Sequence, residues 1–272
     1  MDGTHRKGSD SRPRVVGLIP AAGRGTRLGS LPFSKELYPI GSARFAPGQP
    51  IRERVVAECL LSQMREARIS RALIILRAGK GDIKSYFGSG RDHGLALTYV
   101  ELADSNSVVD SLAQALAAVS GAQIAIGFPD VLLRPYDALK RLISRHRRGS
   151  SEVTLGLFPT DHPAKADMVE CDSQGRVRKL LIKPKESDLR FTWMLAVWSP
   201  LFSRFFLRFH LEDSRAEGTV RGAGRETYPS DVIQAAIDQG MKVGSLRFED
   251  GRCLDIGTPE DLARSVDLQR WI

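Results

Sequence analysis

The sequence has little cysteine and no long apolar run. Its 272 residues include three cysteines, Cys59, Cys171 and Cys253, which are scattered without the spacing of metal ligands. We therefore expect ordinary buried thiols in a reducing compartment. No apolar stretch approaches membrane-spanning length. Residues 1–14 are polar and lack the apolar core of a signal peptide, so we expect a disordered tail on a cytoplasmic protein.

Signatures of nucleic-acid binding are also lacking, although the formal net charge is +8. Only 7% of the residues are aromatic, and no stacking series accompanies the basic side chains. The basic cluster at residues 140–148 falls on one helix and its end, where cations are favoured and where such a run is usually a solvated face. We expect neither a nucleic acid nor a membrane as partner. The positive charge also suits a protein whose ligands are polyanions.

The apolar content of 42% is enough for one large core. Strand-like runs alternate with amphipathic helical patterns along the chain. This alternation predicts an α/β protein with a mostly parallel sheet and helices on both faces. We find no repeat or linker, and we expect a single domain over residues 15–272. The predicted strands are 15–19, 72–76, 95–100, 153–158, 194–198 and 243–248, and the predicted helices are 51–67, 107–120, 136–146 and 231–239.

A glycine-rich turn directly follows the first predicted strand. Gly23 and Gly25 can adopt backbone angles closed to other residues, so successive N–H groups there can converge on an anion. Arg27 and Lys35 then add positive charge. This combination predicts a phosphate-binding turn, whereas a glycine pattern alone is as often a plain tight turn.

Two acidic residues mark later segments. Asp130 ends an apolar run, and ligands of α/β sheets bind beyond such strand ends. Asp255 precedes Gly257 and a well-formed helix start, in which Thr258 is the N-cap and Pro259 the first helical residue. Helix capping accounts for the residues at the helix start, but it gives no reason for an aspartate at position 255 or a glycine at position 257.

Residues 15–40 resemble the signature of the sugar-1-phosphate nucleotidyltransferases, the pyrophosphorylases that include glucose-1-phosphate thymidylyltransferase and UTP-glucose-1-phosphate uridylyltransferase. The resemblance implies a three-layer, Rossmann-like nucleotidyltransferase fold of the GT-A-like kind. It also implies that Arg27 and Lys35 are catalytic and hold the phosphates, although the lysine lies about two residues nearer the arginine than in many members. The nucleotide-binding residues carried over from the signature are Ala21, Ala22, Gly23, Arg24, Gly25 and Thr26.

The same resemblance extends to residues 252–262, which read RCLDIGTPEDL. It implies that Asp130 and Asp255 bind the catalytic magnesium. Magnesium prefers oxygen ligands and is commonly held by one or two carboxylates together with substrate phosphates. Such an ion, with Arg27 and Lys35, would allow two polyanionic substrates to approach each other.

Two further segments resemble the family's substrate pocket. Lys183 matches the lysine that contacts the sugar phosphate, but Ile182 replaces the usual glutamate, so we expect an unusual sugar. Ser111 stands where a glycine usually meets the base, and this leaves uracil, thymine and cytosine open. Residues 212–229 are a candidate lid or a surface excursion.

The resemblance as a whole implies transfer of a nucleoside monophosphate from an NTP, with dTTP or UTP favoured, to a sugar 1-phosphate. Two alternatives remain. One is a cytidylyltransferase for a polyol or alcohol phosphate, which the D-x-G-T-P-E run at residues 255–260 argues against. The other is a catalytically silent regulatory relative, which the joint presence of Arg27, Lys35, Asp130 and Asp255 argues against. Whether the protein forms a homo-oligomer is left open.

Overall fold

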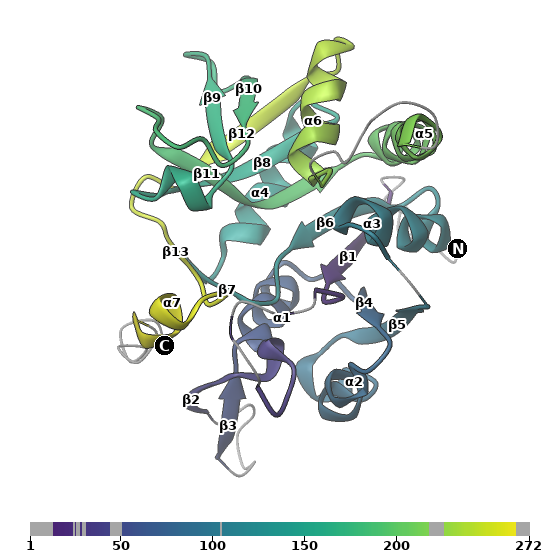
Figure 1. Ribbon diagram of the computed structural model, residues 1–272, viewed down its shortest axis with the longest axis vertical. Helices are drawn as coiled ribbons and strands as arrows, with labels where there is room; N and C mark the ends of the chain where they lie inside the picture. Colours follow the sequence, from purple (N-terminus) through teal and green to yellow (C-terminus); the bar gives the residue numbers. More distant parts are fainter. Residues whose placement is uncertain are drawn as a thin grey trace, which may run out of the picture.

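The computed structural model describes residues 13–23, 25, 28, 31–43, 51–103, 105–217 and 226–264. Most of the predicted N-terminal tail, residues 1–12, lies outside this part of the chain. The described chain forms a nine-stranded mixed sheet with helices on both faces and two short antiparallel ribbons beside it (Figure 1).

Four parallel strands form the half of the sheet that carries the N-terminal motif. β6 (Gln123–Gly127), β1 (Val15–Pro20), β4 (Arg71–Arg77) and β5 (Ala96–Leu102) are adjacent in this order. Continuous apolar runs suit strands that are covered on both faces. Gly17 in β1 is required by packing, because a Cβ there would lie 2.6 Å from the sulfur of Met64.

The other half of the sheet is mainly antiparallel and branches at the long strand β11 (Phe191–Trp198). β11 pairs with β6 and β9 on one edge and with β8 on the other. The remaining strands of this half are β8 (Val153–Pro159), β9 (Met168–Cys171), β10 (Val177–Leu181) and β12 (Val243–Arg247), and β12 runs parallel to β8.

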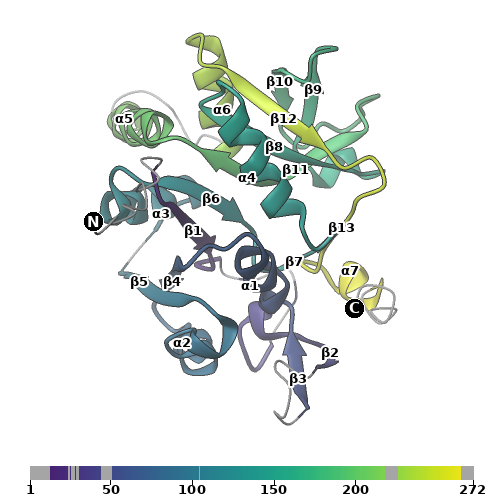
Figure 2. The same ribbon diagram turned by 180° about the vertical axis from the view of Figure 1, so that it is seen from behind.

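The helices form two layers, one on each face of the sheet, as Figures 1 and 2 show. β1 packs against both layers because alternate side chains point to opposite faces of the sheet. Val16 and Leu18 belong to one buried core, and Ile19 belongs to the other. The predicted three-layer α/β fold is confirmed. One layer contains α3 (Val108–Leu116), α5 (Pro200–Glu217) and α6 (Pro229–Asp238), and the other contains α1 (Ala57–Glu66), α2 (Gly81–Phe87) and α4 (Ala138–Arg148).

The two ribbons lie outside the main sheet. β7 (Val131–Arg134) pairs with β13 (Arg252–Asp255), and α7 (Pro259–Arg264) follows β13. β2 (Pro39–Ala43) pairs with β3 (Arg52–Val55) and projects from the body of the molecule (Figure 1). Four 3₁₀ turns complete the described elements: Lys35–Leu37, Arg91–His93, Ala117–Val119 and Pro163–Lys165.

Two sequence predictions need correction. Residues 51–67 are not one helix, because β3 comes first and pairs with β2 before α1 begins. The predicted loop at 212–229 begins later, since α5 continues to Glu217; residues 218–225 lie outside the described part. The three cysteines are free thiols. Within the described residues, no helix is long and apolar enough to span a membrane.

Candidate functional site

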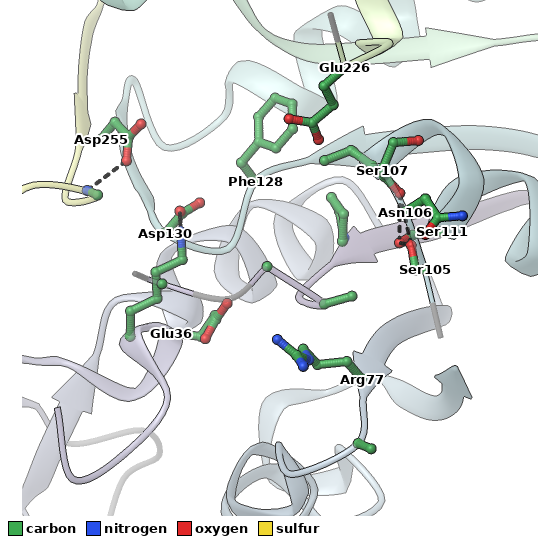
Figure 3. Close-up of a pocket in the computed structure, with 18 of the residues that line it drawn as sticks. Glu36, Arg77, Ser105, Asn106, Ser107, Ser111, Phe128, Asp130, Glu226 and Asp255 are labelled. Atoms are coloured by element: carbon green, nitrogen blue, oxygen red, sulfur yellow. Dashed lines mark hydrogen bonds and ion pairs between the residues drawn. The ribbon is translucent and has the colours of Figure 1, made fainter. Parts of the chain in front are cut away.

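A pocket of about 620 Å³ opens at the ends of β1, β4 and β6. In Figure 3, Glu36, Asp130 and Asp255 lie toward one side, while Ser105, Asn106, Ser107 and Ser111 lie toward the other. Arg77 projects into the space between these two groups, and Phe128 and Glu226 lie across from it. The pocket therefore carries acidic and basic groups at one end and small neutral polar groups at the other, with the charged side chains of Arg77 and Glu226 between the two ends.

The glycine turn after β1 forms part of the pocket wall. Ala21 is buried and continues the strand pairing, since its N–H donates to the carbonyl of Ile75 at 2.9 Å. Ala22, Gly23 and Gly25 line the pocket. Gly25 has a φ of 65°, the left-handed conformation that glycine favours. The predicted nucleotide contacts at Arg24 and Thr26 and the predicted catalytic Arg27 lie outside the described residues.

Gly23 differs from Gly25 because its backbone does not require glycine. In the described part of the chain, a Cβ at Gly23 would meet no atom within 4 Å. The space beside it therefore belongs to the pocket, and the absent side chain leaves room for a ligand to reach the backbone.

Lys35 begins a 3₁₀ turn and points into the charged end of the pocket. Its ammonium group forms an ion pair with the carboxylate of Asp130, and the two side chains are only 19% and 15% exposed. Burial alone would lower the pKa of Lys35, but the charge on Asp130 and its hydrogen bond outweigh burial and raise it. Lys35 therefore carries a full positive charge at neutral pH.

Asp255 reaches the same end of the pocket from the β7–β13 ribbon. It lies opposite Val131, the residue after Asp130, and the N–H of Ile256 donates to the carbonyl of Asp130 at 3.0 Å. Gly257 donates its N–H to Asp255 Oδ1 at 2.8 Å, which orients the carboxylate. Although the residue is open to the pocket, the surrounding protein and the charge on Asp130 raise the pKa of Asp255 to about 6.

The convergence of the two aspartates was predicted, but not the way the chain achieves it. We expected both to follow strands of one parallel sheet. Asp130 does follow β6, whereas Asp255 ends β13, which pairs antiparallel with β7 and is not part of the main sheet. Because both residues sit at one end of this ribbon, their spacing is set by backbone hydrogen bonds across it.

The donor set at this end suits magnesium better than a metal that prefers thiolate or imidazole ligands, such as zinc. Among the described residues, no group of three or more histidine, cysteine or acidic side chains could enclose an ion. Two carboxylates beside an open pocket match an ion that takes its other ligands from water and substrate phosphates. Asp130 and Asp255 would therefore hold magnesium only as part of a complex with substrate.

The neutral end of the pocket is built around the start of α3. Ser107 caps the helix as predicted, accepting a hydrogen bond from the N–H of Asp110 at 3.1 Å. The hydroxyl of Ser111 is 2.6 Å from that of Ser105 and donates to the carbonyl of Ser107 at 3.1 Å. Ser111 thus lines the pocket, but its hydroxyl is already engaged within the helix start.

Several residues of the pocket were missed by sequence reasoning, among them Arg77, Asn106 and Glu226. Arg77 ends β4, next to the strand that carries the glycine turn, and lies opposite Leu102 at the end of β5. Asn106 is exposed beside the α3 cap, and Glu226 lies on the far wall. The signal for Arg77 was available: a charged residue after five buried apolar ones marks the end of a strand beside β1.

Lys183 lies away from the charged end of the pocket. It follows β10 with a φ of 44°, and its ammonium is 4.1 Å from the centre of the Tyr228 ring. It is not part of the pocket wall that contains Asp130. Its predicted contact with a sugar phosphate stays a prediction.

Comparison with known proteins supports one family. The model of the family described as Nucleotidyl transferase matches residues 16–268. Agl11 of Haloferax volcanii, a nucleotidyltransferase of low-salt glycan biosynthesis, is 24% identical over 259 residues, which cover 93% of this chain and 66% of Agl11. The bifunctional protein GlmU of Stutzerimonas stutzeri is 26% identical over 93% of this chain and 51% of its own length. The chain thus spans about half to two thirds of these relatives.

Solved structures share the fold at lower sequence identity. A protein from Bacillus anthracis assigned as a glucose-1-phosphate thymidylyltransferase superposes with a TM-score of 0.76 at 19% identity, over 95% of this chain and 96% of its own. An apo UDP-glucose pyrophosphorylase gives a TM-score of 0.74 at 15% identity, over 94% and 98%. At such identities these likenesses establish the fold alone.

Proposed function

Because the chain belongs to the nucleotidyl transferase family, we propose that it transfers a nucleoside monophosphate from an NTP to a sugar 1-phosphate. The products are a nucleotide-sugar and pyrophosphate. We further propose that residues 15–272 form one catalytic domain, that the reaction depends on magnesium, and that dTTP or UTP is the preferred nucleotide.

One observation carries this proposal. Lys35, Asp130 and Asp255 meet at one end of a pocket whose wall is the glycine turn, and the opposite end is neutral and polar. A nucleotide is itself divided in this way, with its charge on the phosphates and neutral hydrogen-bonding groups on the base. We infer that the phosphates lie beside Gly23 and Lys35 and the base lies beside Ser105 and Asn106.

The reaction requires charge neutralisation more than a protein nucleophile. A phosphate oxygen of the sugar 1-phosphate attacks the α-phosphorus; the new P–O bond forms as the bond to pyrophosphate breaks. Lys35 stabilises negative charge on the phosphates, and the backbone beside Gly23 leaves room for them. Magnesium, when bound by Asp130 and Asp255, would supply further positive charge between the two anionic substrates.

The test is pyrophosphate release measured across the common nucleoside triphosphates and a panel of sugar 1-phosphates and polyol phosphates. We expect turnover with sugar 1-phosphates, and a mediocre rate with glucose 1-phosphate because Ile182 cannot accept the hydrogen bond of a hydroxyl. Turnover only with CTP and a polyol or alcohol phosphate would favour the cytidylyltransferase. Triphosphate binding without turnover on any pair would favour the silent relative.

Lys35→Met should then lower the rate by about a hundred- to a thousand-fold, because it removes a preorganised charge beside the phosphates. Lys84→Met is the matched control, since Lys84 forms an ion pair at 2.9 Å with Glu101 in which both side chains are more than half exposed. Wild-type turnover by the Lys35 variant would contradict the assignment.

A further inference from the structure

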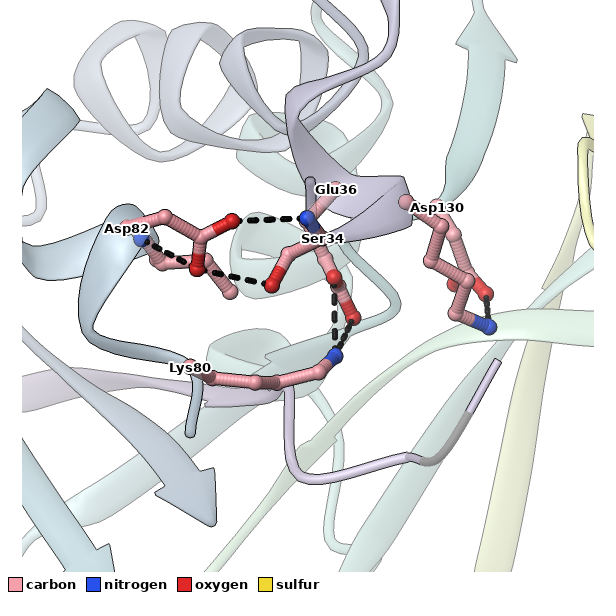
Figure 4. A network of polar contacts seen from close by, with 7 residues as sticks. Ser34, Glu36, Lys80, Asp82 and Asp130 are labelled. Atoms are coloured by element: carbon pink, nitrogen blue, oxygen red, sulfur yellow. Dashed lines mark hydrogen bonds and ion pairs between the residues drawn. The ribbon is translucent and has the colours of Figure 1, made fainter. Parts of the chain in front are cut away.

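Two sets of side-chain contacts, called ties below, hold the short turn that carries Lys35. One is made by Ser34, the residue before Lys35, and the other by Glu36, the residue after it. Ser34 donates both its N–H and its hydroxyl to the carboxylate of Asp82, at 2.6 and 2.8 Å. Glu36 receives the ammonium of Lys80 on both carboxylate oxygens, at 2.8 and 2.9 Å. Figure 4 shows the two ties on one side of the turn and Asp130 on the other.

Both ties end on one three-residue segment. Lys80 and Asp82 lie at the start of α2, directly after β4, and the N–H of Lys80 donates to the carbonyl of Arg77 at the end of that strand at 3.2 Å. The turn is therefore attached to the parallel core of the sheet rather than only to its own loop. In sequence the partners are 48 and 44 positions apart.

Burial distinguishes the Lys80–Glu36 pair from the surface ion pairs of this protein. Its side chains are 11% and 2% exposed, compared with 56% and 59% for Lys84 and Glu101. Surface pairs contribute little, whereas a buried pair with both oxygens engaged fixes the geometry of its surroundings. Glu36 also lines the pocket, where an unneutralised carboxylate would repel a polyanionic nucleotide.

We propose that Lys80 is a positioning residue for Lys35, with Asp82 as the second anchor of the same turn. Lys80 holds Glu36 and neutralises it, so that the Lys35 ammonium is directed at Asp130 and at phosphates bound beside it. Lys80 itself contacts no reacting atom. This inference rests on the proposed role of Lys35 in nucleotidyl transfer.

The test is a double-mutant cycle on kcat between positions 80 and 35. We expect Lys80→Met to lower kcat about 10- to 100-fold, the loss typical of a misplaced catalytic group. In the Lys35→Met background the same change should cost less than about twofold, because the group that Lys80 positions is already gone. Lys84→Met, on the same helix, should leave both backgrounds unchanged.

Stability is measured in parallel, because Lys80→Met leaves a buried carboxylate without its partner. If that variant does not fold, the Glu36→Gln/Lys80→Met pair removes both charges at similar volume. Asp82→Asn, at a partly exposed site, tests the second anchor in the same cycle and should lower kcat about 3- to 10-fold if it displaces the turn. Lys80→Arg, which retains the charge, should recover part of the lost kcat.

The proposal is overturned if Lys80→Met lowers the melting temperature but leaves kcat within twofold of wild type. It is equally overturned if the losses at positions 80 and 35 multiply in the double variant. Absence of turnover by the wild-type protein is a different result, which would overturn the proposed function. The same cycle would then be measured in the Kd for UTP by calorimetry, where non-additive losses support the positioning role and additive losses reject it.

Discussion

The N–H of Ile256 donates a 3.0 Å hydrogen bond to the carbonyl of Asp130. This bond closes the end of the β7–β13 ribbon at the two residues whose carboxylates face the pocket. The main chain thus holds Asp130 and Asp255 at a fixed spacing, although the charge on Asp130 raises the pKa of Asp255. We infer that a cation that prefers oxygen ligands offsets the negative charges of these two carboxylates when substrate binds.

If Asp130 and Asp255 hold one ion, replacing either should be nearly as damaging as replacing both. We expect Asp130→Asn, Asp255→Asn and the double variant to share a low rate, the non-additivity of residues that work as a unit. Excess magnesium should recover part of the rate in the single variants. Manganese binding in the presence of UTP, followed by electron paramagnetic resonance, gives a readout independent of turnover.

Asp161→Asn, at an exposed site, is the control and should behave as wild type. Single losses that multiply in the double variant, with no response to magnesium, would show that the two carboxylates have separate functions.

The fold was largely predictable because its signals are local. The apolar run of β1 and the serine cap of α3 each lie within a few residues, and the structure confirms both. Thr258 caps α7 as expected, accepting from the N–H of Asp261 at 3.2 Å. β3 was missed because its four residues, three of them charged, precede a true helix, and only pairing with β2 makes them a strand.

The site was less predictable because its decisive contacts join distant segments. Lys35 and Asp130 were each identified, but their ion pair depends on how the turn is held by Lys80. Nothing near Lys80 in the sequence indicates a partner 44 positions away. The β7–β13 ribbon was missed for the same reason, since two four-residue segments predict no pairing until the chain is folded.

Gly257 orients Asp255, and its lack of a side chain is part of that function. A Cβ at this position would lie 2.9 Å from Asp255 Oδ1, so Gly257→Ala should push the carboxylate aside. The displaced group is the end of a side chain, so the melting temperature should change little. We expect the rate to fall about tenfold, a modest case of a misplaced group.

The control for this change is Gly149→Ala, where a Cβ would be 3.5 Å from its nearest neighbour, an ordinary contact. Steady-state kinetics and thermal melting of both variants provide the measurement. An unchanged rate in Gly257→Ala would mean that the orientation of Asp255 is not limiting.

Acid stability should depend on His146, a buried residue of α4 whose Nδ1 lies 2.9 Å from Oγ1 of Thr154 in β8. Burial lowers its pKa from 6.5 to about 4. On acidification the unfolded chain therefore binds a proton first, and the free energy of unfolding falls between pH 6.5 and 4. In that window His146→Gln should reduce the slope by up to about 1.4 kcal/mol per pH unit.

Urea unfolding at several pH values measures this slope, with the exposed His162→Gln as control. His93, whose pKa burial also lowers to about 4, contributes in the same direction and is unchanged in both variants. Equal slopes in wild type and His146→Gln would contradict the prediction.

Arg77 should influence which nucleobase is accepted. Its side chain projects into the pocket between the charged end and the Ser105–Ser111 end (Figure 3). A guanidinium is a donor only, so it favours bases that present carbonyl acceptors, such as uracil and thymine, over adenine, whose exocyclic group donates. We expect Arg77→Met to lower kcat/KM for UTP and dTTP at least about tenfold while changing ATP little, since one hydrogen bond to a charged group is worth about 1.5–3 kcal/mol. Arg71→Met, an exposed change at the other end of β4, is the control and should leave the ratios unchanged. Competition assays among UTP, dTTP and ATP measure the ratios of their kcat/KM values directly. A uniform loss with every nucleotide would instead place Arg77 against the phosphates.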